Sequence, residues 1–402
     1  NVIGAGVNRS ELSIGGGATV RVPHVGLSIG SPYYASSNFG ANGSGCFATG
    51  VVSVANGTLA NEGDGNNADW GSDRMAGLIV GNGTVPLSSG AWFSGRLNVG
   101  DGAFVTNGPC PVVVGIGLGE GKVVQTGGTV VSTGTYGLSQ DGGPRGSWEA
   151  KPVVIGAFGG RGEYVMSGGA ATFAAAVFVG GIESNRFCRT FRIPPEDFSH
   201  RQAKGHLSVS GGTFRTKSSL FVGCDGLGTV DVGGDGRIVV AGNLVLSNAV
   251  HSTLRLKPSA GTDPLVDVGG RLVLTDAARV VVDMTDVPAD SARFHPLVRC
   301  DAASAQAFAA RMTVLGDYRG TFLCRDGVWG LGRTVSRAKG FVVMLTGEPP
   351  SEPAHEFVVN GSFEQPGKWS VSDRVYSFSG SEGVDASHDI VIEKSAFNQM
   401  LE

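Results

Sequence analysis

A pair of residues, one apolar and the next glycine, recurs along the chain and divides it into units of related length. The pair occurs at Ile29-Gly30, Val80-Gly81, Val99-Gly100, Val114-Gly115, Ile155-Gly156, Val179-Gly180 and Val222-Gly223. Gly180 follows Gly156 by 24 residues, whereas Gly115 to Gly156 spans 41 residues and Gly180 to Gly223 spans 43. The longer intervals exceed 24 by 17 and 19 residues. A basic unit of 24 residues is therefore interrupted by insertions.

The insertions are visible as changes of composition between the repeated segments. STGTYGLSQDGGPRGSWEAK and ESNRFCRTFRIPPEDFSHRQAK fall inside the two longer intervals, and two earlier insertions show a similar change. The predicted insertions lie near residues 31–49, 61–76, 132–151 and 183–204.

Within the units, apolar residues alternate with other residues over short stretches, as at Val230 and Val232 and at Ile238 and Val240. This alternation is typical of a β-strand with one buried face, and the Gly, Asn-Gly and Asp-Gly residues between such stretches are typical of tight turns. Strands this short cannot each bury a core, but coils stacked on one another bury a continuous one. The repeat therefore predicts an all-β solenoid. A β-sandwich is the alternative, but it has no reason to repeat a 24-residue unit.

Composition narrows the class of protein. Glycine accounts for 66 of the 402 residues, more than twice its average share of about 7 %. Hydrophobic residues make up 41 %, too many for a disordered chain, and glycine does not occupy every third position as in collagen. The net charge is −4, and no apolar run reaches the roughly 18 residues of a membrane span. We therefore expect no nucleic-acid partner and no membrane span in this chain.

Two segments of the repeat resemble a known family. SVSGGTF with LFVG (208–223) and VGCDGLGTVDVGG (222–234) are similar to the repeats of bacterial autotransporter passengers. The resemblance extends over roughly residues 10–285. It implies a single-stranded right-handed parallel β-helix of the pectin-lyase-like kind, exported to an extracellular location or to the bacterial cell surface.

The pattern of the chain predicts four segments. Residues 1–286 form the solenoid, and residues 287–346 form a C-terminal cap, because the last coil would otherwise expose strand edges that pair with other chains. Within the cap, DAASAQAFAARM (301–312) has a helical pattern. Residues 347–356, GEPPSEPAHE, form a proline-rich linker.

The fourth segment, residues 357–402, begins with FVVNGSFEQPGKWSVS, which resembles the opening strands of a carbohydrate-binding β-sandwich module. About 45 residues are too few for such a module, so we interpret the segment as its truncated start. The chain opens on Asn1 rather than on Met. We expect the natural protein to extend beyond both ends.

The insertions are the predicted binding surface, because loops carried on a rigid repeat scaffold commonly bind ligands. They hold many aromatic side chains, which stack on sugar rings, and insertion 183–204 adds a local excess of positive charge suited to an acidic glycan. The alternative is that the aromatic side chains fold down onto the solenoid wall. The predicted ligand-binding residues are Tyr33, Tyr34, Trp70, Tyr136, Trp148, Arg186, Arg189, Phe191 and Arg192. The predicted partners are extracellular glycans or cell-surface proteins.

Three short motifs resemble functional signatures but fit the repeat or a polar loop better. GLSIG (26–30) has the spacing of a nucleophile elbow, but no helix is expected after it. GIGLGEGK (115–122) has Ile116 where a phosphate-binding loop needs its first glycine. EGDGNNADW (62–70) has Ala68 where calcium ligation needs an oxygen. We therefore assign no metal and no cofactor.

The β-helix fold also occurs in polysaccharide lyases and hydrolases, which need carboxylates gathered on one face. Asp225, Asp231 and Asp235 lie in one unit, but the equivalent stretch at 156–170 offers only Glu163. The seven histidines are scattered without metal-ligand spacing, and we assign no catalytic residue. The sequence thus predicts an exported, surface-associated structural or adhesive solenoid that binds glycans through its loops. A polysaccharide lyase or hydrolase is the alternative.

Six cysteines lie at positions 46, 110, 188, 224, 300 and 324, and none forms the C-x-x-C spacing of a zinc site. In an exported protein, Cys300–Cys324 and Cys188–Cys224 are candidate disulfides. Free buried thiols are the alternative, and the spacing does not decide between the two.

Overall fold

The computed structural model places the chain in two compact units, residues 1–333 and residues 334–402. Each unit is considered by itself. The structure describes residues 2–5, 9–22, 26–31, 47–62, 77–83, 92–108, 110–117, 119–134, 152–181, 202–224, 226–247, 251–259, 261–276, 278–289, 291–333, 342–345, 355–358, 376–378 and 390–392.

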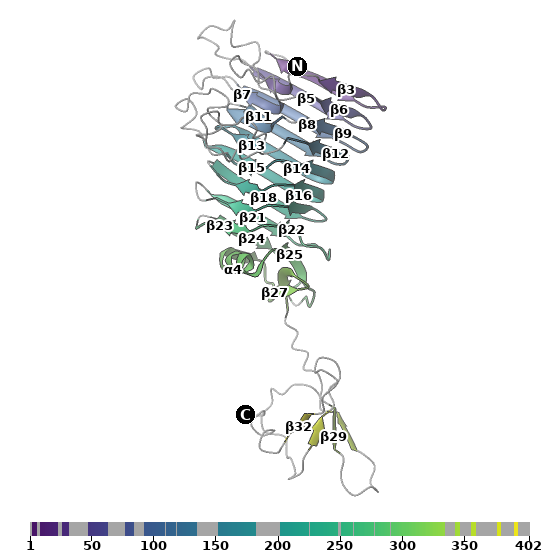
Figure 1. The fold of residues 1–402 in the computed structure, drawn as a ribbon, viewed down its shortest axis with the longest axis vertical. Coiled ribbons are helices and arrows are strands. Elements are labelled where there is room, and N and C mark those ends of the chain that lie inside the picture. Colours follow the sequence, from purple (N-terminus) through teal and green to yellow (C-terminus); the bar gives the residue numbers. More distant parts are fainter. Residues whose placement is uncertain are drawn as a thin grey trace, which may run out of the picture. The chain divides into compact units, whose positions relative to one another are not determined.

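Unit 1 consists almost entirely of β-strands, and nearly all of them run parallel to their neighbours (Figure 1). Successive strands along the chain belong in turn to three series of paired strands. Strands that pair with each other therefore lie about three elements apart in the sequence. We call the three series sheet A, ladder 1 and ladder 2. Sheet A is a separate nine-stranded sheet, whereas the ladders belong to one nineteen-stranded sheet in which two long strands, β14 and β16, pass through both.

Sheet A consists of β1 (Val2–Ala5), β4 (Leu27–Ser31), β7 (Leu78–Gly83), β10 (Val112–Gly117), β13 (Val153–Ala157), β15 (Val177–Val179), β17 (Leu220–Val222), β20 (Leu244–Leu246) and β23 (Leu272–Leu274). Ladder 1 consists of β2 (Arg9–Ile14), β5 (Phe47–Val54), β8 (Trp92–Val99), β11 (Gly119–Gln125), β14 (Arg161–Phe173), β16 (Ala203–Thr216), β18 (Gly226–Gly233), β21 (Ser252–Lys257), β24 (Ala278–Asp283) and β26 (Met312–Leu315). Ladder 2 consists of β3 (Thr19–Val22), β6 (Thr58–Asn61), β9 (Phe104–Asn107), β12 (Thr129–Ser132), the second halves of β14 and β16, β19 (Arg237–Val240), β22 (Val266–Val268) and β25 (His295–Arg299).

The strand register confirms the repeat found in the sequence. Val114 pairs with Ile155, Ile155 with Val179, and Val179 with Val222, so the glycine after each of them takes the same place in successive strands of sheet A. The intervals of 41, 24 and 43 residues are therefore equivalent steps from one strand to the next. The pair Val99-Gly100 does not belong to this series, and the sequence prediction was wrong here. Val99 ends β8 in ladder 1 and pairs with residues of the neighbouring ladder 1 strands.

These glycines allow sheet A and ladder 1 to approach backbone to backbone. Gly115 has φ +73°, a left-handed conformation that other residues rarely adopt. A Cβ atom at this position would overlap the carbonyl oxygen of Arg161 in ladder 1. On the facing strand, a Cβ atom at Gly162 would overlap the carbonyl oxygen of Val114. Each side of the contact thus requires a residue without a side chain.

The core lies between the sheets, because alternate side chains along the strands point inward. Leu207, Val209 and Phe214 of β16 belong to one continuous cluster of buried residues that extends along unit 1. The face of sheet A opposite this core is also apolar, and Val113 and Val154 belong to a second buried cluster there. From β7 to β15, sheet A is therefore buried on both faces, as is usual for parallel sheets.

Several polar side chains inside the core form hydrogen bonds between successive coils. In ladder 2, Asn61 donates from Nδ2 to Asn107 Oδ1 (2.7 Å), and Asn107 donates from Nδ2 to Ser132 Oγ (3.2 Å). Tyr164 donates its hydroxyl proton to Gln125 Oε1 (2.7 Å). Such bonds offset the cost of removing these groups from water.

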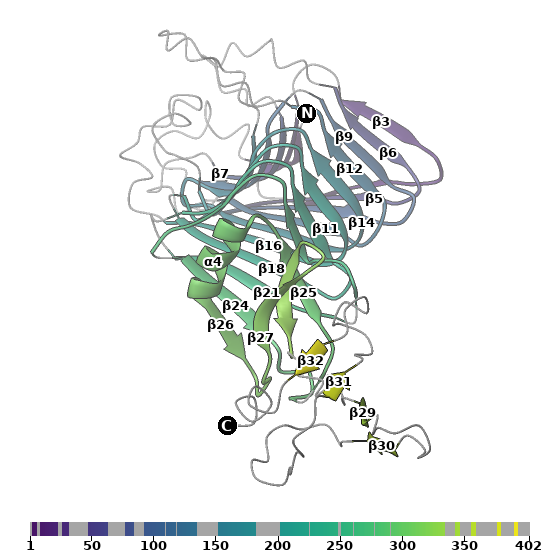
Figure 2. The ribbon, with the colours of Figure 1, turned by 60° about the horizontal axis from the view of Figure 1, so that its bottom comes forward.

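The last strands of sheet A and ladder 2, β23 and β25, are followed by a helix, as expected. α4 (Ala302–Arg311) confirms the predicted helix over 301–312. Its N-cap Asp301 accepts a hydrogen bond from the backbone of Ser304 (3.0 Å), and Ser304 Oγ accepts one from the backbone of Leu272 in β23 (3.0 Å). The helix thus provides a partner for a backbone group of the last strand in sheet A. Figure 2 shows α4, β26 and β27 together at the end of the stack of strands.

Beyond α4, β27 (Thr321–Arg325) and β28 (Val328–Gly332) form an antiparallel hairpin, and β28 also pairs antiparallel with β25. Phe308 of α4 is fully buried and stacks on Phe322 of β27, whose ring stacks in turn on Trp329. The change from parallel to antiparallel pairing ends the stack of coils.

Unit 2 contains a single antiparallel sheet within its described residues. Its strands are β29 (Val342–Leu345), β30 (His355–Val358), β31 (Tyr376–Phe378) and β32 (Ile390–Ile392), in the order β30-β29-β31-β32.

The predictions of an all-β chain and of parallel strand pairing are confirmed. The rotation through sheet A, ladder 1 and ladder 2 is compatible with a β-solenoid.

Candidate functional site

The predicted ligand-binding residues all lie outside the described part of the chain. They are Tyr33, Tyr34, Trp70, Tyr136, Trp148, Arg186, Arg189, Phe191 and Arg192. The strands that flank the insertions are described, and each insertion adjoins sheet A: two follow β4 and β15, and two precede β7 and β13.

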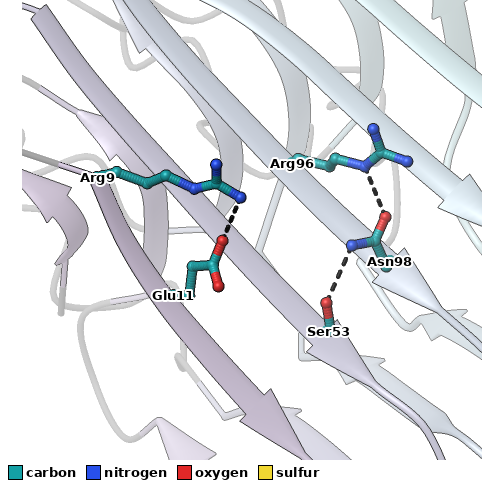
Figure 3. Close-up of polar contacts among 5 residues, drawn as sticks. All are labelled: Arg9, Glu11, Ser53, Arg96 and Asn98. Atoms are coloured by element: carbon teal, nitrogen blue, oxygen red, sulfur yellow. Dashed lines mark hydrogen bonds and ion pairs between the residues drawn. The ribbon is translucent and has the colours of Figure 1, made fainter.

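The outward face of ladder 1 carries polar and charged side chains on several successive strands. Along β11 and β18, buried positions alternate strictly with half-buried ones. Figure 3 shows the beginning of this face, where Arg9 pairs with Glu11 on β2. Two strands further on, Arg96 Nε donates to Asn98 Oδ1 (2.7 Å), and Asn98 Nδ2 donates to Ser53 Oγ of β5 (3.0 Å).

Ion pairs continue this face across β11 and β14. Lys122 Nζ lies 2.7 Å from Glu163 Oε2, and Arg161 Nη1 lies 3.5 Å from Glu120 Oε1. Both pairs join register neighbours on adjacent strands, and all four side chains are at least one-third exposed. Exposed pairs of this kind contribute little to stability, but they hold charged groups at defined positions.

A histidine between two carboxylates is the chemically most capable group on this face. His206 Nε2 lies 2.9 Å from Asp231 Oδ2 on β18, and His206 Nδ1 lies 3.9 Å from Glu163 Oε1 on β14. We call these three residues together with Lys122 the His206 cluster. The His206 side chain is 38 % exposed, so a ligand on the outward face can reach it.

The carboxylates favour the charged form of the imidazole. The hydrogen bond to Asp231 raises the pKa of His206, burial partly opposes this shift, and the charges of Asp231 and Glu163 add to it. Asp231 Oδ1 is buried and has no hydrogen-bond partner among the described residues. A proton can thus reside on an imidazole that faces solvent and lies beside two carboxylates, which is the arrangement needed for general acid–base chemistry.

The His206 cluster should make the stability of unit 1 depend on pH. Because the folded state raises the pKa of His206, the stabilisation is complete below the ordinary histidine pKa of about 6.5 and is lost as pH rises through the higher folded value. We expect His206→Gln to lower the free energy of unfolding at pH 6 by about 1 kcal/mol or less, and by a smaller amount at pH 8.5. Urea unfolding at the two pH values measures this difference.

The control is His251→Gln, since His251 is exposed. A loss of stability from His206→Gln that is equal at both pH values would contradict the ionic role of His206.

This cluster was not predicted from the sequence. The comparison of acids between units found Asp231 and Glu163 but left out His206, which lies on the ladder 1 strand between them. A signal was present: Gly162, Gly205 and Gly228 occupy one register row, and Glu163 and His206 each follow the glycine of their strand.

The structure tests the other predicted sites where they fall on described residues. Ile29 of GLSIG pairs with Val80 in sheet A and belongs to the repeat. Cys300 and Cys324 are free thiols. Cys188 lies outside the described residues, so the Cys188–Cys224 disulfide stays a prediction. Burial raises the pKa of Cys300 to about 11. Within the described ranges, no group of three or more His, Cys, Asp or Glu side chains is arranged to hold a metal ion.

The helices were also examined for membrane-spanning length and hydropathy. No helix in the described part of unit 1 or unit 2 is long and apolar enough to cross a bilayer.

The chain was compared with protein-family models, with curated proteins and with solved structures, and none of the three comparisons found a match.

Proposed function

We propose that this chain is an exported, surface-associated protein with a structural or adhesive role, built as a right-handed parallel β-helix like the passengers of autotransporters. It binds extracellular glycans or cell-surface proteins through its inserted loops. The observation that carries the proposal is the placement of the insertions: all four adjoin sheet A, while the strands of sheet A keep one unbroken register. A scaffold that accepts long insertions next to one sheet, without loss of register, supports loops whose sequence is free to serve binding.

The insertion near 183–204 provides the sharpest test, because its short equivalent exists in the same structure. The connection from Val179 to Ala203 comprises residues 180–202, whereas the equivalent connection from Val222 to Gly226 comprises only residues 223–225. Replacing residues 180–202 by Gly-Cys-Asp, the residues of the short connection, should preserve unit 1 and remove four of the predicted ligand-binding residues.

We expect the full chain to bind acidic glycans on an array, and the shortened variant to lose at least about tenfold in affinity, or roughly 1.4 kcal/mol. Circular dichroism and thermal unfolding check that the variant is folded. Arg215→Ala, an exposed change in ladder 2, is the control for a general loss of positive charge. Unchanged glycan binding by a folded shortened variant would contradict a role of this loop.

The second candidate is a polysaccharide lyase or hydrolase, which the His206 cluster favours. Acid–base cleavage needs proton donors and acceptors close together on an accessible face, and Asp231, His206 and Glu163 meet that need. On this hypothesis the full chain depolymerises an acidic polysaccharide, and Asp231→Asn removes turnover while the loop-shortened variant retains part of it. If the full chain releases no product, the enzyme hypothesis is contradicted and only the binding role remains.

A further inference from the structure

His295, the first residue of β25, is a buried imidazole without hydrogen bonds. Its residue surface is 5 % exposed, and neither ring nitrogen has a hydrogen-bond partner among the described residues. The strand that carries it pairs antiparallel with β28, where His295 lies opposite Leu331. It therefore occupies the junction at which parallel pairing gives way to the closing hairpin.

The surroundings of His295 suit the neutral ring and not the imidazolium. The Tyr318 ring lies edge-on to it, with centroids 5.5 Å apart, and the Tyr318 hydroxyl donates to the carbonyl of Arg293 (3.4 Å). Arg293 acts on His295 through its charge, and Arg325 and Arg333 act in the same way on Tyr318.

The remaining charged groups on the adjoining segments point to the same conclusion. Asp317 and Arg319 flank Tyr318, Asp326 lies in the turn between β27 and β28, and Arg299 ends β25; all four are exposed. Arg299 already pairs with Asp267 (2.8 Å). Within the described residues, no carboxylate interacts with His295, and protonation would add a positive charge near Arg293.

The strands at this point have little room to adjust. A Cβ atom at Gly330 of β28 would overlap the carbonyl oxygen of His295. The two backbones are therefore in direct contact, and the ring cannot reach water unless β25 and β28 separate. Burying an unpaired charge costs several kcal/mol, so separation is the cheaper response to protonation.

We propose that this junction is an acid-sensitive latch: protonation of His295 releases β25 from β28 and opens the closing hairpin of unit 1. Opening uncovers Leu331 and Val328, which are buried in the closed form, and a free strand edge on β25. Burial and the charge of Arg293 lower the pKa of His295. The neutral ring is thus retained at neutral pH, and the stability of the closed form falls as pH drops below the ordinary histidine value of about 6.5.

Amide hydrogen exchange of the full chain at pH 7.5 and pH 5.5, corrected for the intrinsic effect of pH, tests the latch. Peptides covering β25 and β28 should lose protection at pH 5.5, by up to about tenfold for each unit by which burial lowers the pKa. Peptides covering β18 serve as the internal reference, since Asp231 of this strand pairs with His206, whose protonation acts in the opposite direction. A measurement of global unfolding would combine the opposite pH effects of His206 and His295. The local measurement by hydrogen exchange is therefore required.

Two variants separate protonation from packing. His295→Phe keeps an aromatic ring beside Tyr318 but cannot be protonated, and it should show equal protection of β25 at both pH values; His251→Gln should behave like the unaltered protein. Equal protection of β25 at both pH values in the unaltered protein would overturn the proposal, whether or not His295→Phe folds. An undiminished acid effect in His295→Phe, or in His295→Leu if the phenylalanine variant does not fold, would overturn it as well.

Discussion

Replacing Gly115 by alanine is expected to destabilise unit 1 by more than about 4 kcal/mol, a loss large enough to prevent stable folding. Two effects add at this position. The backbone has φ +73°, which costs a residue with a side chain about 1–2 kcal/mol. The new methyl group would also overlap the carbonyl oxygen of Arg161, a backbone atom that moves only if two strands separate.

Two further glycines isolate these effects. Gly327 has φ +74° in a turn and open space where a Cβ would lie, so Gly327→Ala should cost only about 1 kcal/mol. Gly100 has no positive φ, and a Cβ there would make an ordinary 3.4 Å contact with Ala55, so Gly100→Ala should be nearly neutral. Soluble yield and urea unfolding rank the three variants. A Gly115→Ala protein as stable as Gly327→Ala would show that the backbone contact is not tight.

Phe214→Ala is expected to lower the free energy of unfolding by about 3–5 kcal/mol, the usual cost of removing a fully buried aromatic ring. Phe214 is 0 % exposed. Its ring lies 5.5 Å from that of Tyr164 and 5.1 Å from that of Phe173, so three rings from neighbouring coils fill one layer of the core. Alanine would leave a cavity that a close-packed interior fills poorly.

Phe104→Ala is the matched control, because Phe104 also lies in ladder 2 but is 43 % exposed. Its loss should stay within about 0.5 kcal/mol. Denaturant unfolding of both variants, monitored by circular dichroism, gives the comparison. Similar losses for the two changes would contradict the inward orientation of Phe214.

Much of the fold was predictable because it repeats. In sheet A, the glycine after the apolar residue marks a point where two backbones touch, as at Gly81, Gly115 and Gly156, and that requirement is strict enough to leave a trace in one sequence. The marker fails where the contact changes. In the next strand of sheet A, the position equivalent to Gly223 is Ser247, which is not a glycine. The hydroxyl of Ser252 donates to the carbonyl of Ser247 (3.0 Å). The 24-residue step from Leu220 to Leu244 is thus present in the structure but invisible in the glycine pattern.

The helix over 301–312 was also predictable, since its signals are local. A run of alanines favours the helix, and Asp301 provides the N-cap. The His206 cluster was not, because its members come from strands separated by insertions of unequal length. Glu163 and His206 are 43 residues apart, and His206 and Asp231 are 25 apart.

By itself, the sequence determined the strands, the turns and the spacing of coils, because alternation and glycine positions are imposed by backbone geometry within one or two neighbouring strands. Only the tertiary structure decided which side chains meet. It brought His206 between two carboxylates, left Cys300 and Cys324 as separate thiols, and enclosed His295 without a partner. These outcomes depend on register and on burial across strands distant in sequence, and no local pattern encodes them.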